Sequence, residues 1–154
     1  MTDLLSTALM AASDDLRGQP VWRAWVGVGS FIVLEMGGRR RSGSEDIGEY
    51  HLWVCGMDWE LSLNGVVVAT DIDDRDTMVM AVEGFTGRVV TRFDFDPKTL
   101  GFVLEANGGL HLRVFPSIYV SMNEWMLFMP DGMVWSVEDG RLLHEHESSD
   151  KAPL

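Results

Sequence analysis

The stretch DWELSLNGVVVAT, residues 58–70, carries the strongest hairpin signal in the chain. Trp59, Leu61 and Leu63 alternate with polar residues, as in a strand that has one buried and one solvated face. Asn64-Gly65 follows, and these residue types suit the positive φ angles that a two-residue hairpin turn requires. The pattern therefore predicts an antiparallel hairpin and, with it, an antiparallel sheet.

Similar short strands lie on both sides of this hairpin. VWRAWVGV and FIVLEM precede it and are separated by a Gly29-Ser30 turn. RVVTRFDFD, GFVLEA, LHLRVF, EWMLFM and MVWSVED follow it. In the first of these, strict alternation predicts one common face for Val89, Thr91, Phe93 and Phe95. We expect about ten short strands, joined as a meander.

Two segments have the 3.6-residue period of amphipathic helices instead. The first spans residues 3–17, and its apolar stripe consists of Leu5, Leu9, Ala12 and Leu16. The second spans residues 75–84 and has Asp73 or Asp74 as its N-cap. Its inward face consists of Met78, Val79 and Val82.

Residues 37–49, GGRRRSGSEDIGE, interrupt the strand pattern. They are rich in glycine and charge and have no apolar periodicity, which predicts a long mobile loop. The remaining elements predict an α+β protein, in which a twisted antiparallel meander forms a sandwich or a partly open barrel with both helices packed against it. We expect a single domain over residues 1–143 and a polar C-terminal tail over residues 144–154.

The most prominent compositional feature is acidity. Twenty-four carboxylates face twelve lysines and arginines, which gives a formal net charge of −12. Such a surface repels nucleic acid and anionic membranes and attracts basic proteins, although acidity also serves solubility alone. The apolar runs are too short to cross a bilayer, and Asp3 opposes a signal peptide. We therefore expect a cytoplasmic monomer or weak homodimer with a basic protein partner.

The densest acidic segment is DIDDRD, residues 71–76. It fails as a calcium loop, because the places for an oxygen ligand, a glycine and a glutamate hold Arg75, Asp76 and Val82. Its carboxylates are instead candidates for contacting a basic partner, together with two acids of the arginine-rich segment. The predicted partner-binding residues are Asp71, Asp73, Asp74, Asp76, Glu45 and Asp46.

The sequence shows no recognisable set of catalytic residues. The chain lacks nucleophile-elbow, phosphate-loop, dinucleotide-binding and zinc-protease motifs, so no catalytic residue and no cofactor is predicted. Cys55, the only cysteine, is expected to be a small buried apolar residue. His51 and His111 are expected to be half-exposed on strands.

His144 and His146 share one face of a strand and could chelate a metal ion with a third ligand from elsewhere. No such ligand is signalled, so we predict no metal site. A metal-dependent enzyme would require these two histidines to be ordered together with carboxylates of another strand.

Six tryptophans fall in predicted strands, at positions 22, 25, 53, 59, 125 and 135. Packing between sheet layers is one interpretation of this pattern. A ligand-binding groove lined by two or three of these side chains is the alternative.

Residues 50–137 show a suggestive order of features. YHLWV leads to DWELSLNG, a short helix leads to GFTGRVVTRFDFD, and LGFVLEANGGLHLRVFP, NEWMLFMPDG and MVWSV follow. This order resembles small acidic bacterial proteins of unknown function, some of which are similar to immunity proteins of polymorphic toxin systems. The resemblance implies binding and blocking of a cognate toxin, and it implies no catalytic residues.

The sequence therefore predicts a non-enzymatic, acidic protein-binding module of immunity or inhibitor type, which blocks a basic partner such as a toxin or a nuclease. A small-molecule-binding β-barrel or sandwich with a tryptophan-lined pocket is the alternative.

Overall fold

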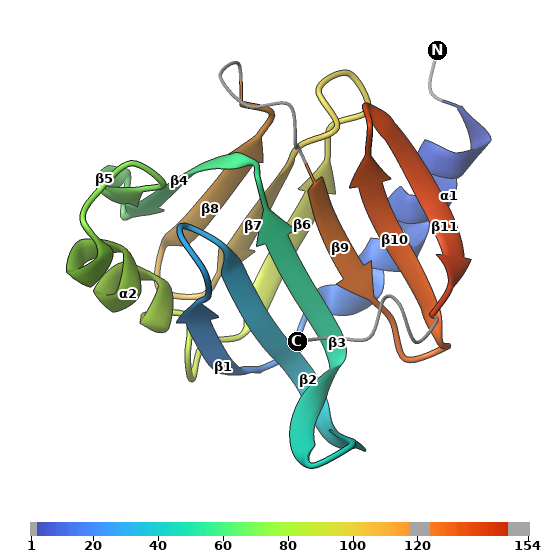
Figure 1. Cartoon of the computed structure of the whole chain (residues 1–154), viewed down its shortest axis with the longest axis horizontal. Helices are drawn as coiled ribbons and strands as arrows, with labels where there is room; N and C mark the ends of the chain where they lie inside the picture. The colour runs from blue at the N-terminus through green and yellow to red at the C-terminus, as the bar shows by residue number, and fades with distance from the viewer. Residues whose placement is uncertain (1–2, 118–123, 148–154) are drawn as a thin grey trace.

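A computed structural model of the chain describes residues 3–117 and 124–147, apart from the side chain of Ser42. Two antiparallel sheets pack face to face around one apolar core (Figure 1). The prediction of an α+β protein built mainly from an antiparallel meander is confirmed. The described residues form eleven strands, and the two sheets make an open sandwich and not a closed barrel.

The first sheet has six strands in the order β1-β2-β3-β9-β10-β11. Their bounds are Val21–Val26 (β1), Ile32–Ser42 (β2), Glu45–Cys55 (β3), Glu124–Phe128 (β9), Met133–Glu138 (β10) and Arg141–His146 (β11). The second sheet has five strands in the order β5-β4-β8-β7-β6. Their bounds are Asp58–Leu63 (β4), Val66–Thr70 (β5), Val90–Phe95 (β6), Phe102–Ala106 (β7) and Leu110–Phe115 (β8).

The 58–70 hairpin forms as its sequence predicts. β4 pairs with β5 across a turn in which Asn64 and Gly65 have φ angles of 53° and 82°. Trp59 and Leu61 are fully buried, because alternate β4 side chains face the first sheet. This hairpin forms one end of the five-stranded sheet, so β5 is an edge strand.

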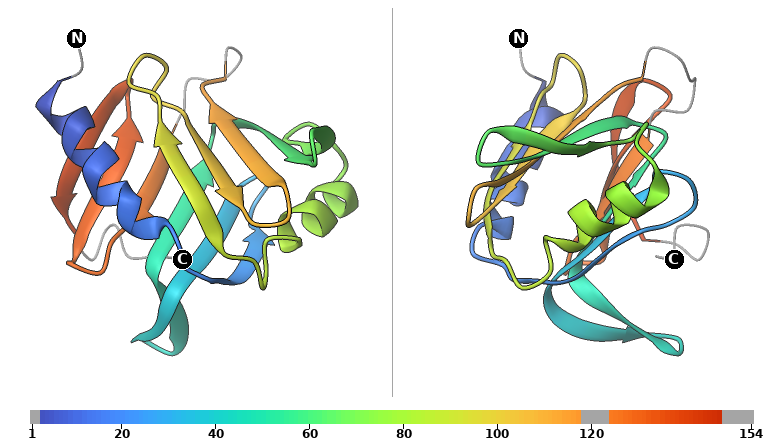
Figure 2. Two further views of the ribbon diagram at one scale, coloured as in Figure 1. Left: turned by 180° about the vertical axis from the view of Figure 1, so that it is seen from behind. Right: turned by 90° about the vertical axis from the view of Figure 1, so that its left-hand side faces the viewer.

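Each open side of the sandwich is closed by a helix. Helix α1 (Leu4–Ser13), continued by the 3-10 turn η1 (Asp14–Leu16), lies across β6 and β11 (Figure 2, left). Its side chains Leu9 and Leu16 are fully buried, which confirms the predicted stripe. Helix α2 (Arg75–Glu83) closes the opposite side and packs against β1 and β5 (Figure 2, right).

The prediction of a mobile loop over residues 37–49 is wrong. These residues form the outer part of the β2–β3 hairpin, with Arg40 opposite Ile47 and Ser42 opposite Glu45. The hairpin projects beyond the sandwich as a two-stranded ribbon (Figure 1), so it needs no apolar alternation. Glycine is required at position 48, because a Cβ there would lie 2.6 Å from the Met36 backbone.

The prediction of one common face for Val89, Thr91, Phe93 and Phe95 is wrong. A register shift between Val90 and Arg92 breaks the alternation, which places Val90 in the core and leaves Val89 and Thr91 exposed. Phe93 and, further along the strand, Phe95 share one face, which points inward.

The last strand, β11, continues to His146 and pairs with β10 along its whole length. The predicted start of the tail at residue 144 therefore falls within a strand. Residues 148–154 of that tail lie outside the described residues.

Candidate functional site

Helix α2 is held in place at its N-terminal end by two neighbouring residues. Asp74 caps its N-terminus by accepting the Thr77 N–H at 3.1 Å. Arg75 then reaches the β1–β2 turn, where its guanidinium donates to the carbonyl oxygens of Val26, Gly27 and Gly29 at 3.0–3.2 Å. The single cation of the acidic segment thus has a structural role, since it joins α2 to the first sheet.

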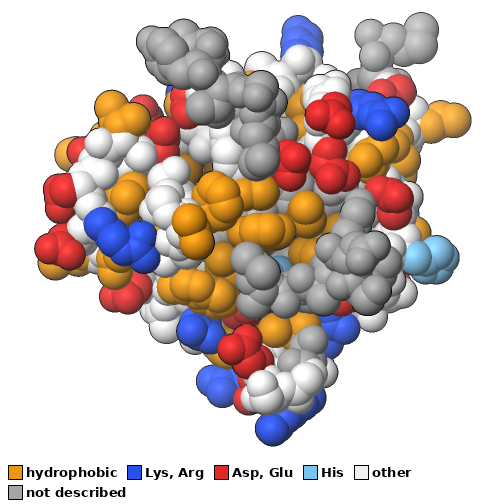
Figure 3. Space-filling view, viewed as in Figure 1, with side chains coloured by type: hydrophobic (Ala, Val, Ile, Leu, Met, Phe, Trp, Pro, Cys, Tyr) orange, Lys and Arg blue, Asp and Glu red, His pale blue; other side chains and the backbone are white. Residues whose placement is uncertain are grey.

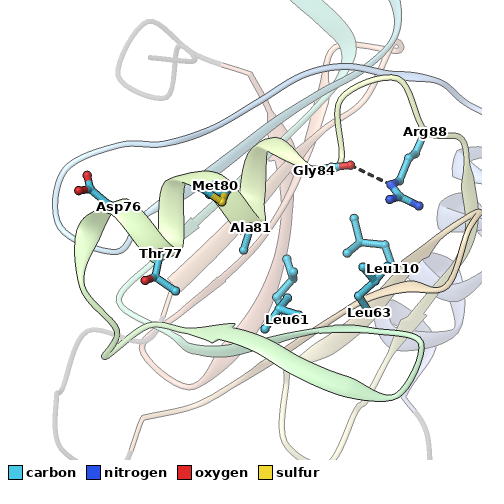
Figure 4. Close-up of a pocket in the computed structure, with 10 residues that line it drawn as sticks. Leu61, Leu63, Asp76, Thr77, Met80, Ala81, Gly84, Arg88 and Leu110 are labelled. Atoms are coloured by element: carbon cyan, nitrogen blue, oxygen red, sulfur yellow. Dashed lines mark hydrogen bonds between the residues drawn. The ribbon is translucent and has the colours of Figure 1, made fainter.

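The nine-residue helix does not fill the space above the five-stranded sheet. A pocket of about 430 Å³ lies between α2 and strands β4, β5 and β8. Its lining residues are Leu61, Leu63, Val68, Asp76, Thr77, Met80, Ala81, Gly84, Arg88 and Leu110. Ala81 of α2 and Leu61 of β4 point toward one another across it (Figure 4). The pocket is therefore apolar at its centre.

The two charged residues of the pocket lie toward opposite ends of α2. Asp76 is in the first turn of the helix and is exposed. Arg88 lies beyond its C-terminus and is fixed by donating to the carbonyl oxygens of Gly84 and Asn107, each at 2.8 Å. Within the described residues Asp76 has no ion pair, so its carboxylate is available to a ligand.

Apolar side chains are unusually exposed around this pocket. Val66 is 65% exposed, Ile72 88% and Met80 77%. We call the pocket together with Val66, Val67, Val68, Ile72 and Met80 the α2–β5 surface. Figure 3 shows apolar side chains beside carboxylates at the end of the molecule where α2 and β5 lie. Exposed apolar groups gathered around a hollow are typical of an interaction site.

Three of the predicted partner-binding aspartates have structural roles. Asp71 accepts the Trp59 N–H at 3.0 Å, Asp73 accepts the Thr70 N–H at 2.8 Å, and Asp74 is the helix cap. Only Asp76 combines exposure with a place at the pocket. The acidic segment therefore builds the turn between β5 and α2, and through Asp76 it places one carboxylate at the pocket.

Hydrogen bonding and burial shift two of these carboxyls in opposite directions. Hydrogen bonds from the Thr77 side chain and backbone hold the pKa of Asp74 below its ordinary value. Burial raises the pKa of Asp71, and the neighbouring Asp58 carboxylate raises it further, against the effect of the Trp59 N–H.

The remaining two predicted partner-binding residues, Glu45 and Asp46, lie on the projecting β2–β3 hairpin and do not line the pocket. Asp46 is 4.0 Å from Arg41 across the hairpin. Glu45 lines a second recess, of about 290 Å³, on the outer face of the six-stranded sheet. Trp25 and Trp53 line the same recess.

All six tryptophans lie in strands, as predicted, but they fall into two groups. Trp59, Trp125 and Trp135 are buried in the core. The first two donate their indole N–H groups to the carbonyl oxygens of Ser30 and Leu100, each at 2.8 Å. The other three, Trp22, Trp25 and Trp53, are partly exposed. Packing in the core thus accounts for three of the six tryptophans.

The expectation that His51 is half-exposed is wrong. It is fully buried, and its Nδ1 lies 2.6 Å from Glu35 Oε1. The reason is that this part of the outer sheet face is apolar, with Phe128 against the His51 ring and Met126 and Val134 beside it. His111 is partly exposed, as expected.

The other candidate reactive groups do not assemble. His144 stacks on Trp135 at 3.7 Å between ring centroids, and the described residues contain no group of three or more potential metal ligands. Cys55 is buried as predicted. Burial, followed by the Glu124 carboxylate, raises the pKa of its thiol to about 12, so it is not a thiolate at neutral pH.

Comparisons with protein-family models, with curated proteins and with solved structures find no match. The resemblance of residues 50–137 to immunity proteins therefore stays a prediction from the sequence. In the part of the chain that the structure describes, no helix has the length and apolar character needed to span a bilayer.

Sequence reasoning missed the apolar half of the α2–β5 surface. The signal was present in VVVAT, a strand without the polar alternation expected of an edge. The pocket itself depends on how far α2 stands from β4, which no local pattern encodes.

Proposed function

We propose that this chain is a non-enzymatic binding protein that captures a basic protein partner, in the manner of an immunity or inhibitor protein, and that the α2–β5 surface is its binding face. The observation that carries the proposal is the set of exposed apolar side chains around an apolar pocket that has the carboxylate of Asp76 in its lining. Protein interfaces combine an apolar centre with a polar rim in this way.

Charge defines the kind of partner. The chain has a formal net charge of −12, and Asp73, Asp74 and Asp76 are exposed beside the pocket. Carboxylates at the rim of an interface accelerate association with a cationic partner and discriminate against an anionic one. An apolar side chain of the partner would occupy the pocket, and flanking lysines or arginines would meet the rim.

Affinity capture from the native host tests this proposal. We expect the wild-type protein to retain one basic protein and the Met80→Glu variant to lose it, because a charge at the pocket border opposes desolvation. Leu4→Glu is the matched control, since Leu4 is 90% exposed on α1, at the opposite side of the sandwich. Equal capture by all three proteins would refute the proposed face.

The rim is tested separately through the rate of association. Asp76→Asn should slow binding of the isolated partner and reduce its dependence on salt, whereas affinity at high salt should change little. Asp76 is the suitable position, because substitutions at Asp71, Asp73 or Asp74 would also alter side chains that accept structural hydrogen bonds.

A second candidate function is supported by the recess on the outer sheet face. Its walls include Trp25, Phe31 and Trp53, and its volume of about 290 Å³ is near the lower limit for a small-molecule site. A small planar ligand would stack on the indoles and quench their fluorescence. Trp25→Phe should then weaken the quenching, and Trp125→Phe, in the core, should leave ligand affinity unchanged.

A further inference from the structure

Strand β5 differs from the other edge strands of the sandwich. The four edges are β1, β5, β6 and β11, and three of them carry charged side chains. These are Arg23 in β1, Arg92 and Asp94 in β6, and Arg141 and Glu145 in β11. Charges on an edge discourage pairing with further strands. β5, with the sequence VVVAT, has none.

The free edge of β5 is also accessible. Val66, Val67 and Val68 are 65%, 49% and 39% exposed, so α2 does not cover them. β5 pairs with β4 alone, and within the described residues no backbone hydrogen bond joins Val66–Ala69 to any other element. Only the end of the strand is closed, where Asp73 accepts the Thr70 N–H at 2.8 Å.

We infer that the partner binds by adding a β-strand to the free edge of β5. This inference rests on the proposed function and specifies its mode of recognition. The added strand would form main-chain hydrogen bonds with β5 and place one apolar side chain in the adjacent pocket, where Val68 and Met80 lie. Its basic residues would lie at the α2 end of β5, beside Asp73, Asp74 and Asp76.

Charge selects this occupant over a second copy of the chain. Two copies paired through β5 would bring two molecules of net charge −12 together, which opposes association at low salt. A cationic strand gains from the same charge. The occupant is therefore an extended, basic segment with an apolar residue, and the protein on its own stays monomeric.

Peptide probes test this mode directly. A synthetic peptide of alternating valine and lysine should bind and slow amide exchange at the outward-facing β5 positions by about tenfold or more. A peptide of alternating valine and glutamate should not bind. The valine–lysine peptide with every residue N-methylated keeps its charge, but its methyl groups replace the main-chain donors and block close approach of its backbone, so it should protect no β5 amide. Equal binding by the methylated peptide, or protection elsewhere, would overturn the inference.

Proline variants separate this inference from the proposed function. Val66 and Val67 are consecutive, so one directs its N–H toward β4 and the other outward. We would make both Val66→Pro and Val67→Pro and select the variant that keeps the wild-type melting temperature, because it removes only the outward N–H donor. We expect this selected variant to lose the captured partner. If this variant binds normally while Met80→Glu does not, the face is correct and strand addition is wrong. If both bind normally, both proposals fail.

Discussion

At the scale of single residues, Glu35 and His51 form a buried polar pair in the six-stranded sheet, and this pair should be costly to disrupt. One carboxylate oxygen, Oε1, lies 2.6 Å from His51 Nδ1 and accepts the Gly48 N–H at 3.0 Å. Both side chains are 1% exposed, so neither can exchange its partner for water. The pair fixes the register of β2 on β3, where the two residues stand opposite each other.

Removal of one member should therefore be costly. We expect Glu35→Ala to lower the free energy of unfolding by about 3 kcal/mol, because it strands a buried imidazole and a backbone N–H. Urea denaturation measures the change. Glu49→Ala is the control: Glu49 also accepts a backbone N–H, from Gly38 at 2.7 Å, but it is exposed and should matter much less. Similar losses in the two variants would contradict the assigned role.

Asp71 should make the folded protein less stable as the pH rises. Its pKa is raised above the ordinary value of 3.8, so its stabilising influence is greatest at low pH and is lost as the pH rises through the folded-state pKa. Asp71→Asn keeps an acceptor for the Trp59 N–H without the charge. We expect this variant to exceed the wild type in stability at neutral pH, by less than about 1 kcal/mol because the site is partly solvated.

Thermal melts across the acidic range check this expectation. The advantage of Asp71→Asn should shrink as the pH falls and the wild-type carboxyl becomes protonated. An advantage that is constant with pH would show that the effect has a different origin.

The sequence predicts some of these roles and not others. Asp74 stands directly before an apolar-periodic segment, which is sufficient to identify a helix cap. Asp71 and Asp73 accept N–H groups of Trp59 and Thr70, and those bonds follow from the path of the turn. His51 is buried, and it packs edge-on against Phe128, which is far away in the chain. Local patterns do not contain such long-range contacts.

At the scale of elements, the contact between α2 and the first sheet depends on Arg75. Its guanidinium donates from two nitrogens to three carbonyls of the β1–β2 turn, whereas a lysine ammonium has a single nitrogen from which to reach them. Arg75→Lys should therefore cost about 1 kcal/mol of stability and speed amide exchange in that turn. Arg17→Lys is the matched control, because among the described residues Arg17 forms an ion pair only with exposed Asp14. If exchange in the turn is unchanged, α2 is held by its apolar face alone.

Elements with regular periods were predictable, and irregular ones were not. The stripe of α1 and the alternation of β4 identified both elements, since burial on one face leaves a period in the sequence. Most side chains of the β2–β3 hairpin are exposed where it projects, with Ile47 a buried exception, so no period marks it. The break in β6 is a single register shift beside Val90, and nothing in RVVTRFDFD distinguishes it from an unbroken strand.

At the scale of the whole molecule, the excess of carboxylates opposes the compact state. Twenty-four acidic and twelve basic residues repel on balance, and salt screens that repulsion. We expect the urea midpoint to rise between about 10 mM and about 300 mM NaCl, over which the Debye length falls from about 30 Å to below 8 Å. The same titration near pH 4.5, the sequence pI, is the control. There the salt effect should be small, and an equal rise at both pH values would exclude net repulsion as its cause.

The order of the strands also has a consequence for the synthesis of the chain. The five-stranded sheet is built from one continuous stretch, Asp58 to Phe115, whereas the six-stranded sheet combines the first strands with the last and is joined only where β3 meets β9. A growing chain can therefore complete the first of these sheets while the second is still in two halves. Until β9 emerges, the core face of the early sheet has β1–β3 and the helices against it but lacks β9–β11. Synthesis of the segment that contains β9–β11 thus determines when the nascent protein is no longer prone to aggregation and chaperone binding.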